Sequence, residues 1–227
     1  MLFSSVTTLL SLAAAGSAAT LPSAFAGAKR QSGSISITPH DRYSSSIGVL
    51  GCKIDTNRVA YWPSSPGCDD ICVKVTANGR SVNLLKIDQS GGAFDISYDA
   101  WNYLVTGQGA AENPTQGGGV PATYETVDPS ECASLITEPS GKLAFSAANS
   151  MNFVTSCPAG TWVGDNLALY NIINSVCTYG YDETCQLPDP SQGNQPICPH
   201  TLGLTTPLTS QPVYNIDYGT GATSLAV

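Results

Sequence analysis

Two runs of strand-forming residues lie close together near the middle of the chain. They are ICVKVT at residues 71–76 and SVNLLKI at residues 81–87, and the tetrapeptide ANGR separates them. Asn-Gly between two such runs is a strong hairpin signal, because both central positions of a type I′ turn need positive φ. The pattern predicts a β-hairpin within a region of dense short β elements that covers residues 34–135.

A short helical pattern follows this hairpin. Ser97 is expected to cap the helix, Ile96 and Trp101 to form a hydrophobic staple, and Gly107 to end it. Trp101 is expected to lie in the core. Two aspartates frame the stretch before this helix, since Asp88 closes a strand and Asp95 precedes the cap.

The second half of the chain contains one helical pattern, DNLALYNIINSVCTYG. Asp165 is expected to cap this helix and Gly180 to end it. Its apolar stripe would be Leu169, Ile172, Ile173 and Val176. By composition, residues 186–197 are expected to form a loop, and the chain beyond Cys198 is expected to be an extended tail.

The first 30 residues have the pattern of a secretory signal and a short pro-segment. An apolar run is followed by small residues, with cleavage expected near Ala18 or Ala26 and after the basic pair Lys29-Arg30. We therefore expect a protein that is secreted, either extracellular or in the cell wall. No later apolar run approaches the roughly 20 residues of a membrane helix.

Charge and cysteine content narrow the class of protein. Loss of residues 1–30 takes the formal net charge from −8 to −10, which argues against nucleic acid or an anionic membrane as a partner. Neutral glycans remain acceptable. Eight cysteines in a secreted chain predict disulfides, whereas metal binding is disfavoured because there are only two histidines and no paired Cys-x-x-Cys clusters. No metal or other cofactor is expected.

Three segments in order resemble a known family: SISITPHDRYSSSIGVLGC, then SPGCDDICVKVTANGRSVNLLKIDQSGGAFDISYDAWNYL, then ATYETVDPSECASL. They look like the cerato-platanins, small secreted fungal proteins, and more broadly like the double-psi β-barrels of expansins, barwin-like proteins and family-45 endoglucanases. The similarity runs from about residue 34 to 135. It implies a mainly β fold with a six-stranded double-psi β-barrel and a shallow groove.

The expected organisation is a signal and pro-segment at 1–30, a barrel domain at 31–135 and a smaller disulfide-rich extension of unknown fold at 136–227. The resemblance also implies disulfides Cys52–Cys68 and Cys72–Cys132, so that the two sets of four cysteines form two units. Three pairings remain open among the other four cysteines, which are Cys157, Cys177, Cys185 and Cys198.

The resemblance also implies site residues. Asp88 corresponds to a groove-floor aspartate, Asp95 to the general acid of the enzymes' His-Phe-Asp motif, and Tyr43 to a groove tyrosine. This chain has Ala93 in place of the histidine, and the second carboxylate of the enzymes has no counterpart except Asp41.

Each of these residues also has a structural interpretation. Asp95 can hold the turn and oppose the helix dipole without any ligand, so Asp88 is the better candidate for ligand contact. Trp62, in AYWPSSPGC, either stacks on a sugar from an exposed loop or packs over the barrel end. His40 beside Asp41 suggests a dyad, but a solvated loop histidine is the simpler interpretation.

The leading hypothesis is a non-hydrolytic protein that binds cell-wall polysaccharide (chitin, cellulose or β-glucan) through Asp88, Asp95, Tyr43 and Trp62. One alternative is a glycan hydrolase or lytic transglycosylase that uses Asp95 and Asp88, since glycoside hydrolysis usually needs two carboxyl groups. Another is an effector or elicitor that contacts a host protein through residues 136–227.

Overall fold

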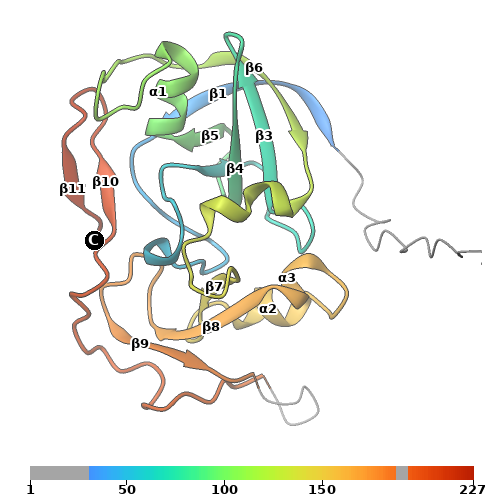
Figure 1. Cartoon of the computed structure of the whole chain (residues 1–227), viewed down its shortest axis with the longest axis vertical. Helices are drawn as coiled ribbons and strands as arrows, with labels where there is room; N and C mark the ends of the chain where they lie inside the picture. The colour runs from blue at the N-terminus through green and yellow to red at the C-terminus, as the bar shows by residue number, and fades with distance from the viewer. Residues whose placement is uncertain (1–30, 188–193) are drawn as a thin grey trace, which may run out of the picture.

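The computed structural model describes residues 31–187 and 194–227, so the expected signal and pro-segment lie outside the described residues. The chain is mainly β with short helices (Figure 1). The barrel half contains β1 (Ser32–His40), η1 (Gly51–Lys53), β2 (Val59–Trp62), β3 (Cys72–Ala77), β4 (Arg80–Gln89), β5 (Phe94–Ser97), α1 (Tyr98–Thr106), β6 (Val120–Thr126) and η2 (Pro129–Leu135). The rest contains β7 (Leu143–Ser146), α2 (Met151–Ser156), α3 (Trp162–Asp165), β8 (Leu167–Ile172), β9 (Gly180–Cys185), β10 (Tyr214–Ile216) and β11 (Thr223–Leu225).

Six strands close into a barrel in the order β1-β5-β2-β4-β3-β6. The pairs β1/β5 and β2/β4 are parallel, and the remaining neighbours are antiparallel. Each parallel pair joins strands that are distant in sequence, which interlocks the two halves of the barrel. The expected six-stranded barrel is confirmed. No helix in the described part of the chain is long and apolar enough to cross a membrane.

The predicted hairpin is confirmed as β3 and β4. Asn78 and Gly79 have φ of 51° and 74°, as a type I′ turn requires. The predicted helix is confirmed as α1, and Gly107 ends it in the left-handed conformation with its N–H bonded to the Tyr103 carbonyl. Ser97 is the N-cap residue, but its hydroxyl donates to the Asn57 carbonyl instead of capping the helix.

The barrel interior forms one of two hydrophobic cores. It gathers side chains from the barrel strands and from the buried face of α1, including the fully buried Ile37, Leu84, Ile96 and Leu104. Trp101 is 1% exposed, so its expected place in the core is confirmed. Burial of these side chains supplies the main driving force for barrel closure.

The helix predicted at residues 165–180 is wrong. Residues 167–172 form strand β8, which lies between β7 (parallel) and β9 (antiparallel) in a three-stranded sheet. Because both faces of this strand are covered, its apolar run does not alternate and resembles a buried helix. Gly180 is the first residue of β9 and not a helix stop; its φ is +113°, and a Cβ there would lie 2.2 Å from the Asn171 carbonyl oxygen.

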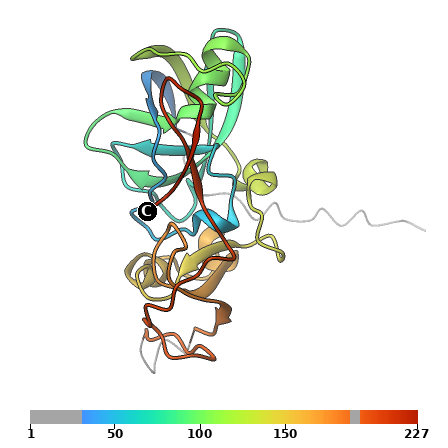
Figure 2. The same ribbon diagram turned by 90° about the vertical axis from the view of Figure 1, so that its left-hand side faces the viewer.

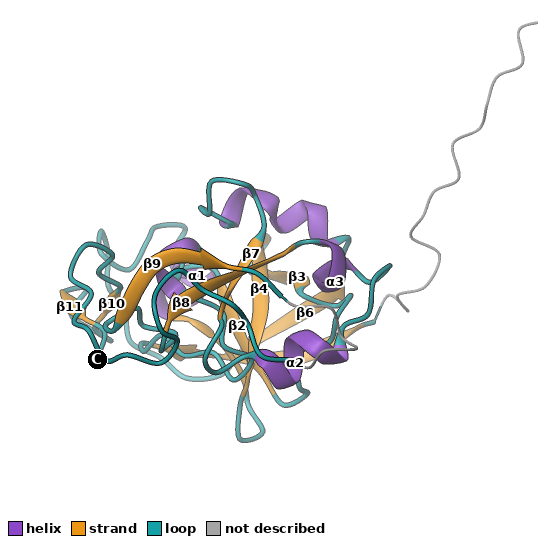
Figure 3. Ribbon diagram, turned by 90° about the horizontal axis from the view of Figure 1, so that it is seen from below, coloured by secondary structure: helices purple, strands orange, loops and turns teal. Residues whose placement is uncertain are grey.

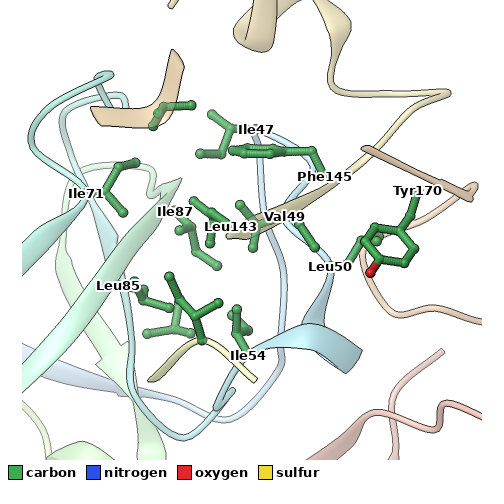
Figure 4. Packing of buried hydrophobic residues seen from close by; sticks show 14 of the residues in the cluster. Ile47, Val49, Leu50, Ile54, Ile71, Leu85, Ile87, Leu143, Phe145 and Tyr170 are labelled. Carbon is green, nitrogen blue, oxygen red and sulfur yellow. The ribbon is translucent and has the colours of Figure 1, made fainter. Parts of the chain in front are cut away.

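This three-stranded sheet packs against the outside of the barrel. Figure 1 shows β7, β8 and β9 below the barrel, and Figure 3 looks onto them from underneath. Between the two lies the second core, in which Leu85 and Ile87 of β4 meet Leu143 and Phe145 of β7, with Val49 between them (Figure 4). The two halves of the chain therefore share one continuous apolar core.

Two disulfides cross from one half to the other. Cys52 pairs with Cys177 and Cys68 with Cys157, so the implied Cys52–Cys68 bond and the grouping into two separate units are wrong. The reason is the docking of the halves: Gly51 N–H bonds to the Ser175 carbonyl beside Cys177. The implied Cys72–Cys132 bond is present, and Cys185 pairs with Cys198.

The chain beyond Cys198 is not a simple extended tail. Residues 213–226 fold back as a hairpin of β10 and β11 that lies along the barrel near α1 (Figure 1, left). We call these residues the strap. Its two ends are anchored by Val213 and Ala226, which are 3% and 1% exposed.

Candidate functional site

A row of polar residues crosses four neighbouring barrel strands. Thr38 of β1 pairs with Asp95 of β5, Asp95 pairs with Tyr61 of β2, and Tyr61 pairs with Asp88 of β4. Residues directly opposite each other in a sheet project from the same face. The register places the two predicted aspartates on either side of Tyr61, next to an irregularity in the pairing of β2 with β4 between Ala60 and Tyr61, and the charges of both act on the Tyr61 phenol.

Asp88 is the buried carboxylate of this row, at 8% exposure. Its Oδ1 accepts from the backbone N–H groups of Ser46 and Gln89, each at 2.8 Å, and its Oδ2 accepts from the Ser44 hydroxyl. With both oxygens engaged, the carboxylate anchors the loop that follows β1. Its expected role as the principal ligand contact does not fit this geometry.

Asp95 is half-buried and lies nearer to solvent. The Thr38 hydroxyl donates to Asp95 Oδ1, and within the described residues no other donor to this carboxylate is found. The adjacent turn is held by Ser90, whose hydroxyl accepts from Gly92 N–H and donates to the Ala93 carbonyl. No hydrogen bond between Asp95 and this turn is found among the described residues, so the turn-holding role expected for Asp95 is not seen, and its role as a ligand contact stays a prediction.

Tyr61 was considered with Trp62 as a possible sugar-stacking ring of an exposed loop, but not as a member of this polar row. It is 3% exposed, and the His40 ring lies against it with the ring centroids 4.4 Å apart. Burial raises the pKa of its phenol far above the ordinary value, and the charge of Asp88 raises it further. The phenol thus stays neutral between the two aspartates. Only the strand register, which the sequence does not show, could have identified it.

Tyr43 is buried and does not line an open groove. Its hydroxyl donates to the Val49 carbonyl at 2.8 Å, and its backbone N–H donates to the side chain of Asn215 in the strap. Burial, followed by the proximity of Tyr61 and Asp88, raises the pKa of the Tyr43 phenol well above its usual value. Its expected contact with a sugar would require the strap to move.

Trp62 lies in strand β2 at 3% exposure, so of its two interpretations the packed side chain fits the structure and the exposed stacking loop does not. The indole packs edge-on against Phe94 and Tyr124, with centroid distances of 5.3 and 4.7 Å. The strand extends to Trp62 because its apolar side chain fills this end of the barrel. Its Nε1–H has no hydrogen-bond partner within the described structure.

The His40–Asp41 dyad is not formed. His40 ends β1 and contacts Tyr61, whereas Asp41 accepts from the backbone N–H of Tyr218 in the strap at 3.3 Å. No group of three or more metal-ligating side chains occurs among the described residues. The site as assembled offers one accessible carboxylate, a neighbouring hydroxyl and an imidazole on a rigid sheet.

Part of the chain is similar to known proteins. Residues 42–135 match the cerato-platanin family model. The solution structure of the fungal elicitor cerato-platanin is 25% identical; the match covers 43% of this chain and 96% of that one, with a TM-score of 0.33. The crystal structure of cerato-platanin 3 from M. perniciosa is 16% identical, with 44% and 98% covered and a TM-score of 0.32. No curated protein matches the chain.

Proposed function

Starting from a cerato-platanin-like barrel, we propose that this protein is secreted and binds cell-wall polysaccharide without hydrolysing it. The observation that carries the proposal is the polar row on the sheet surface, in which Asp95 and Thr38 present accessible hydrogen-bonding groups. Asp88 and Tyr61 fix the sheet and the loop beside them. A rigid polar surface of this kind suits sugar hydroxyls, because little conformational entropy is lost on binding.

Location and charge support the same proposal. The four disulfides fit an extracellular protein. With Lys29 and Arg30 removed, 17 acidic residues face seven basic ones, a balance unsuited to polyanions and compatible with neutral glycans such as chitin, cellulose or β-glucan.

The arrangement does not favour hydrolysis. Asp88 and Asp95 lie on strands that flank β2, with Tyr61 between them. Both oxygens of Asp88 already accept hydrogen bonds from Ser44, Ser46 and Gln89, so this carboxylate is poorly suited to activate a water molecule.

The test is binding to insoluble chitin, cellulose and β-glucan, together with an assay for new reducing ends. We expect wild-type protein to sediment with at least one polymer and to release no reducing ends. Asp95→Asn should weaken binding several-fold, because it removes the accessible charged acceptor. Glu112→Gln, at an exposed position outside the row, is the matched control.

Absence of binding to all three polymers would overturn the proposal. Release of reducing ends that Asp95→Asn abolishes would instead establish the hydrolase or lytic transglycosylase.

A second candidate is an effector or elicitor that contacts a host protein. Its support is the distribution of exposed apolar side chains, since within the described residues every large one lies in the region 179–227: Tyr179, Leu187, Ile197, Leu204, Tyr214, Tyr218, Leu225 and Val227. Exposed apolar side chains mark interaction surfaces where they form a contiguous patch. If Ile197→Ser with Leu204→Ser abolishes an effect on host tissue and leaves glycan binding intact, the protein-facing role is supported.

A further inference from the structure

The strap covers part of the surface to which the candidate site belongs. In Figure 2 the hairpin of residues 213–226 crosses in front of the barrel strands. Its strands β10 and β11 pair with each other, but neither joins the barrel sheet or the three-stranded sheet. It is therefore held in place by its side chains and turns.

One side chain of the strap is inserted into the barrel surface. Asn215 is 7% exposed, and its Oδ1 accepts from the backbone N–H of Tyr43 at 2.9 Å. Around it the contacts are more exposed: Arg42 lies 3.5 Å from Asp217, and Gly219 N–H donates to the Tyr98 hydroxyl at 3.2 Å. Asn215 is thus the central buried polar contact of the strap.

A small hollow remains beneath the inserted side chain. It holds about 20 Å³, room for one water molecule, and its lining includes His40, Tyr61, Tyr98 and Asp99 from the barrel and Asn215 from the strap. His40 and Tyr61 also belong to the candidate site, where Tyr61 lies between the two aspartates. The strap therefore closes one end of that same surface.

We propose that the strap is a lid and that Asn215 occupies the position of a ligand group. Its carboxamide oxygen saturates the Tyr43 N–H, a buried donor that would otherwise be available to a hydroxyl or carbonyl oxygen of a bound glycan. Lifting the strap lengthens the binding surface from Asp95 and His40 to Tyr98. This inference rests on the proposed polysaccharide binding and adds its regulation.

The strap is built to open without unfolding the barrel. No disulfide follows Cys198, and the two-stranded hairpin is of a size that is marginally stable by itself. Its buried apolar anchors, Val213 and Ala226, lie at its base. Further along, Ile216 packs against the barrel core and the Tyr218 ring contacts Tyr98, and near the surface the strap is held by hydrogen bonds and the Arg42–Asp217 ion pair. The apparent affinity for ligand is then the affinity of the open form multiplied by the fraction of molecules in which the strap is open.

The experiment compares wild type, Asn215→Ala and the control Asn152→Ala in the full chain. Asn152 is an exposed asparagine on α2, away from the strap. Amide hydrogen exchange at Gly219 reports opening, because that N–H of the strap donates to the Tyr98 hydroxyl and is not part of the substituted contact. Affinity is measured for soluble chitin and β-glucan oligosaccharides. Loss of one buried hydrogen bond shifts opening on the order of tenfold, so Asn215→Ala should exchange faster at Gly219 and bind about tenfold more tightly, while Asn152→Ala matches wild type.

Faster exchange at Gly219 with unchanged or weaker binding would overturn the lid, whereas wild-type binding would still support the proposed function. Binding that appears only in Asn215→Ala supports the lid and shows that the open surface around Asp95 is insufficient. No binding by any of the three proteins removes both proposals. Unchanged exchange in Asn215→Ala would also overturn the lid, since Asn215 would then not hold the strap closed.

Discussion

The barrel interior and the core beneath it are stabilised in different ways. The barrel closes through strand pairing and a core drawn from the first half of the chain, plus one side chain of the strap, Ile216. The lower core takes side chains from both halves, and two disulfides cross it. The first region can form from nearby sequence, whereas the second needs almost the whole chain. The C-terminal half is thus attached to the barrel as a structural support.

The largest effect is expected from emptying the shared core. Phe145 is fully buried between the barrel and the lower sheet, so Phe145→Ala should lower the free energy of unfolding by about 3–5 kcal/mol. Because the core is continuous, we expect one cooperative transition for the whole chain by calorimetry. Two separate transitions, with only one of them shifted, would show that the halves unfold independently.

The crossing disulfide should be nearly as important. The double variant Cys52→Ala/Cys177→Ala opens a cross-link between positions 125 residues apart, and we expect a loss of roughly 3–5 kcal/mol in urea unfolding. The control is Cys185→Ala/Cys198→Ala, whose bond spans 13 residues and lies within one half. An equal loss in both variants would contradict the special role of the crossing bond.

Two glycines with positive φ, Gly180 and Gly79, differ in how crowded their surroundings are. At Gly180 a Cβ would collide with the Asn171 carbonyl oxygen, so Gly180→Ala should cost roughly 3 kcal/mol. At Gly79, in the hairpin turn, no atom lies within 4 Å, and Gly79→Ala should cost only about 1 kcal/mol. Thermal unfolding of both variants checks the order; a larger loss at Gly79 would contradict it.

The smallest effect expected is the pH dependence of the contact between Glu138 and Tyr170 of the three-stranded sheet β7-β8-β9. Burial acts to raise the pKa of Glu138, but hydrogen bonds from Ser140 and Tyr170 outweigh it and hold the pKa below the ordinary 4.5. A carboxylate with a lowered pKa stabilises the fold above that pH and loses its contribution as the pH falls.

Tyr170→Phe should therefore reduce stability by under about 1 kcal/mol at neutral pH, and by less at pH 3. Tyr179→Phe, at an exposed position, is the control. A stability difference between Tyr170→Phe and wild type that grows on acidification would contradict this pH dependence.

What the sequence predicted depended on how local the signal was. The hairpin at Asn78-Gly79 and the end of α1 at Gly107 follow from backbone conformations that a few residues determine. Strand β8 did not, because a short apolar run covered on both faces has the same pattern in a strand and in a helix. The partner of Cys52 depends on the docking of Gly51 against Ser175, a contact between distant segments.

The candidate site divides in the same way. The two aspartates were identified from the sequence, but their roles depend on hydrogen-bond partners 42 to 57 residues away. Ser44, Ser46 and Gln89 donate to Asp88, whereas among the described residues Thr38 alone donates to Asp95. The burial of Trp62 and Tyr43 could not be predicted from the sequence. It depends on the pairing of β2 with β4 and on the contact of Tyr43 with the strap, and both join segments that are distant in the chain.

The order of the cysteines also has a consequence for biosynthesis. Cys52 leaves the ribosome 125 residues before Cys177, an interval of about 6–25 s at ordinary translation rates. From the synthesis of Cys68 until Cys157 follows 89 residues later, the reduced Cys52 and Cys68 are near neighbours in the growing chain, and neither native partner yet exists. A premature bond between them would have to be exchanged later, so we expect the yield of native protein to depend on a disulfide isomerase in the oxidising compartment.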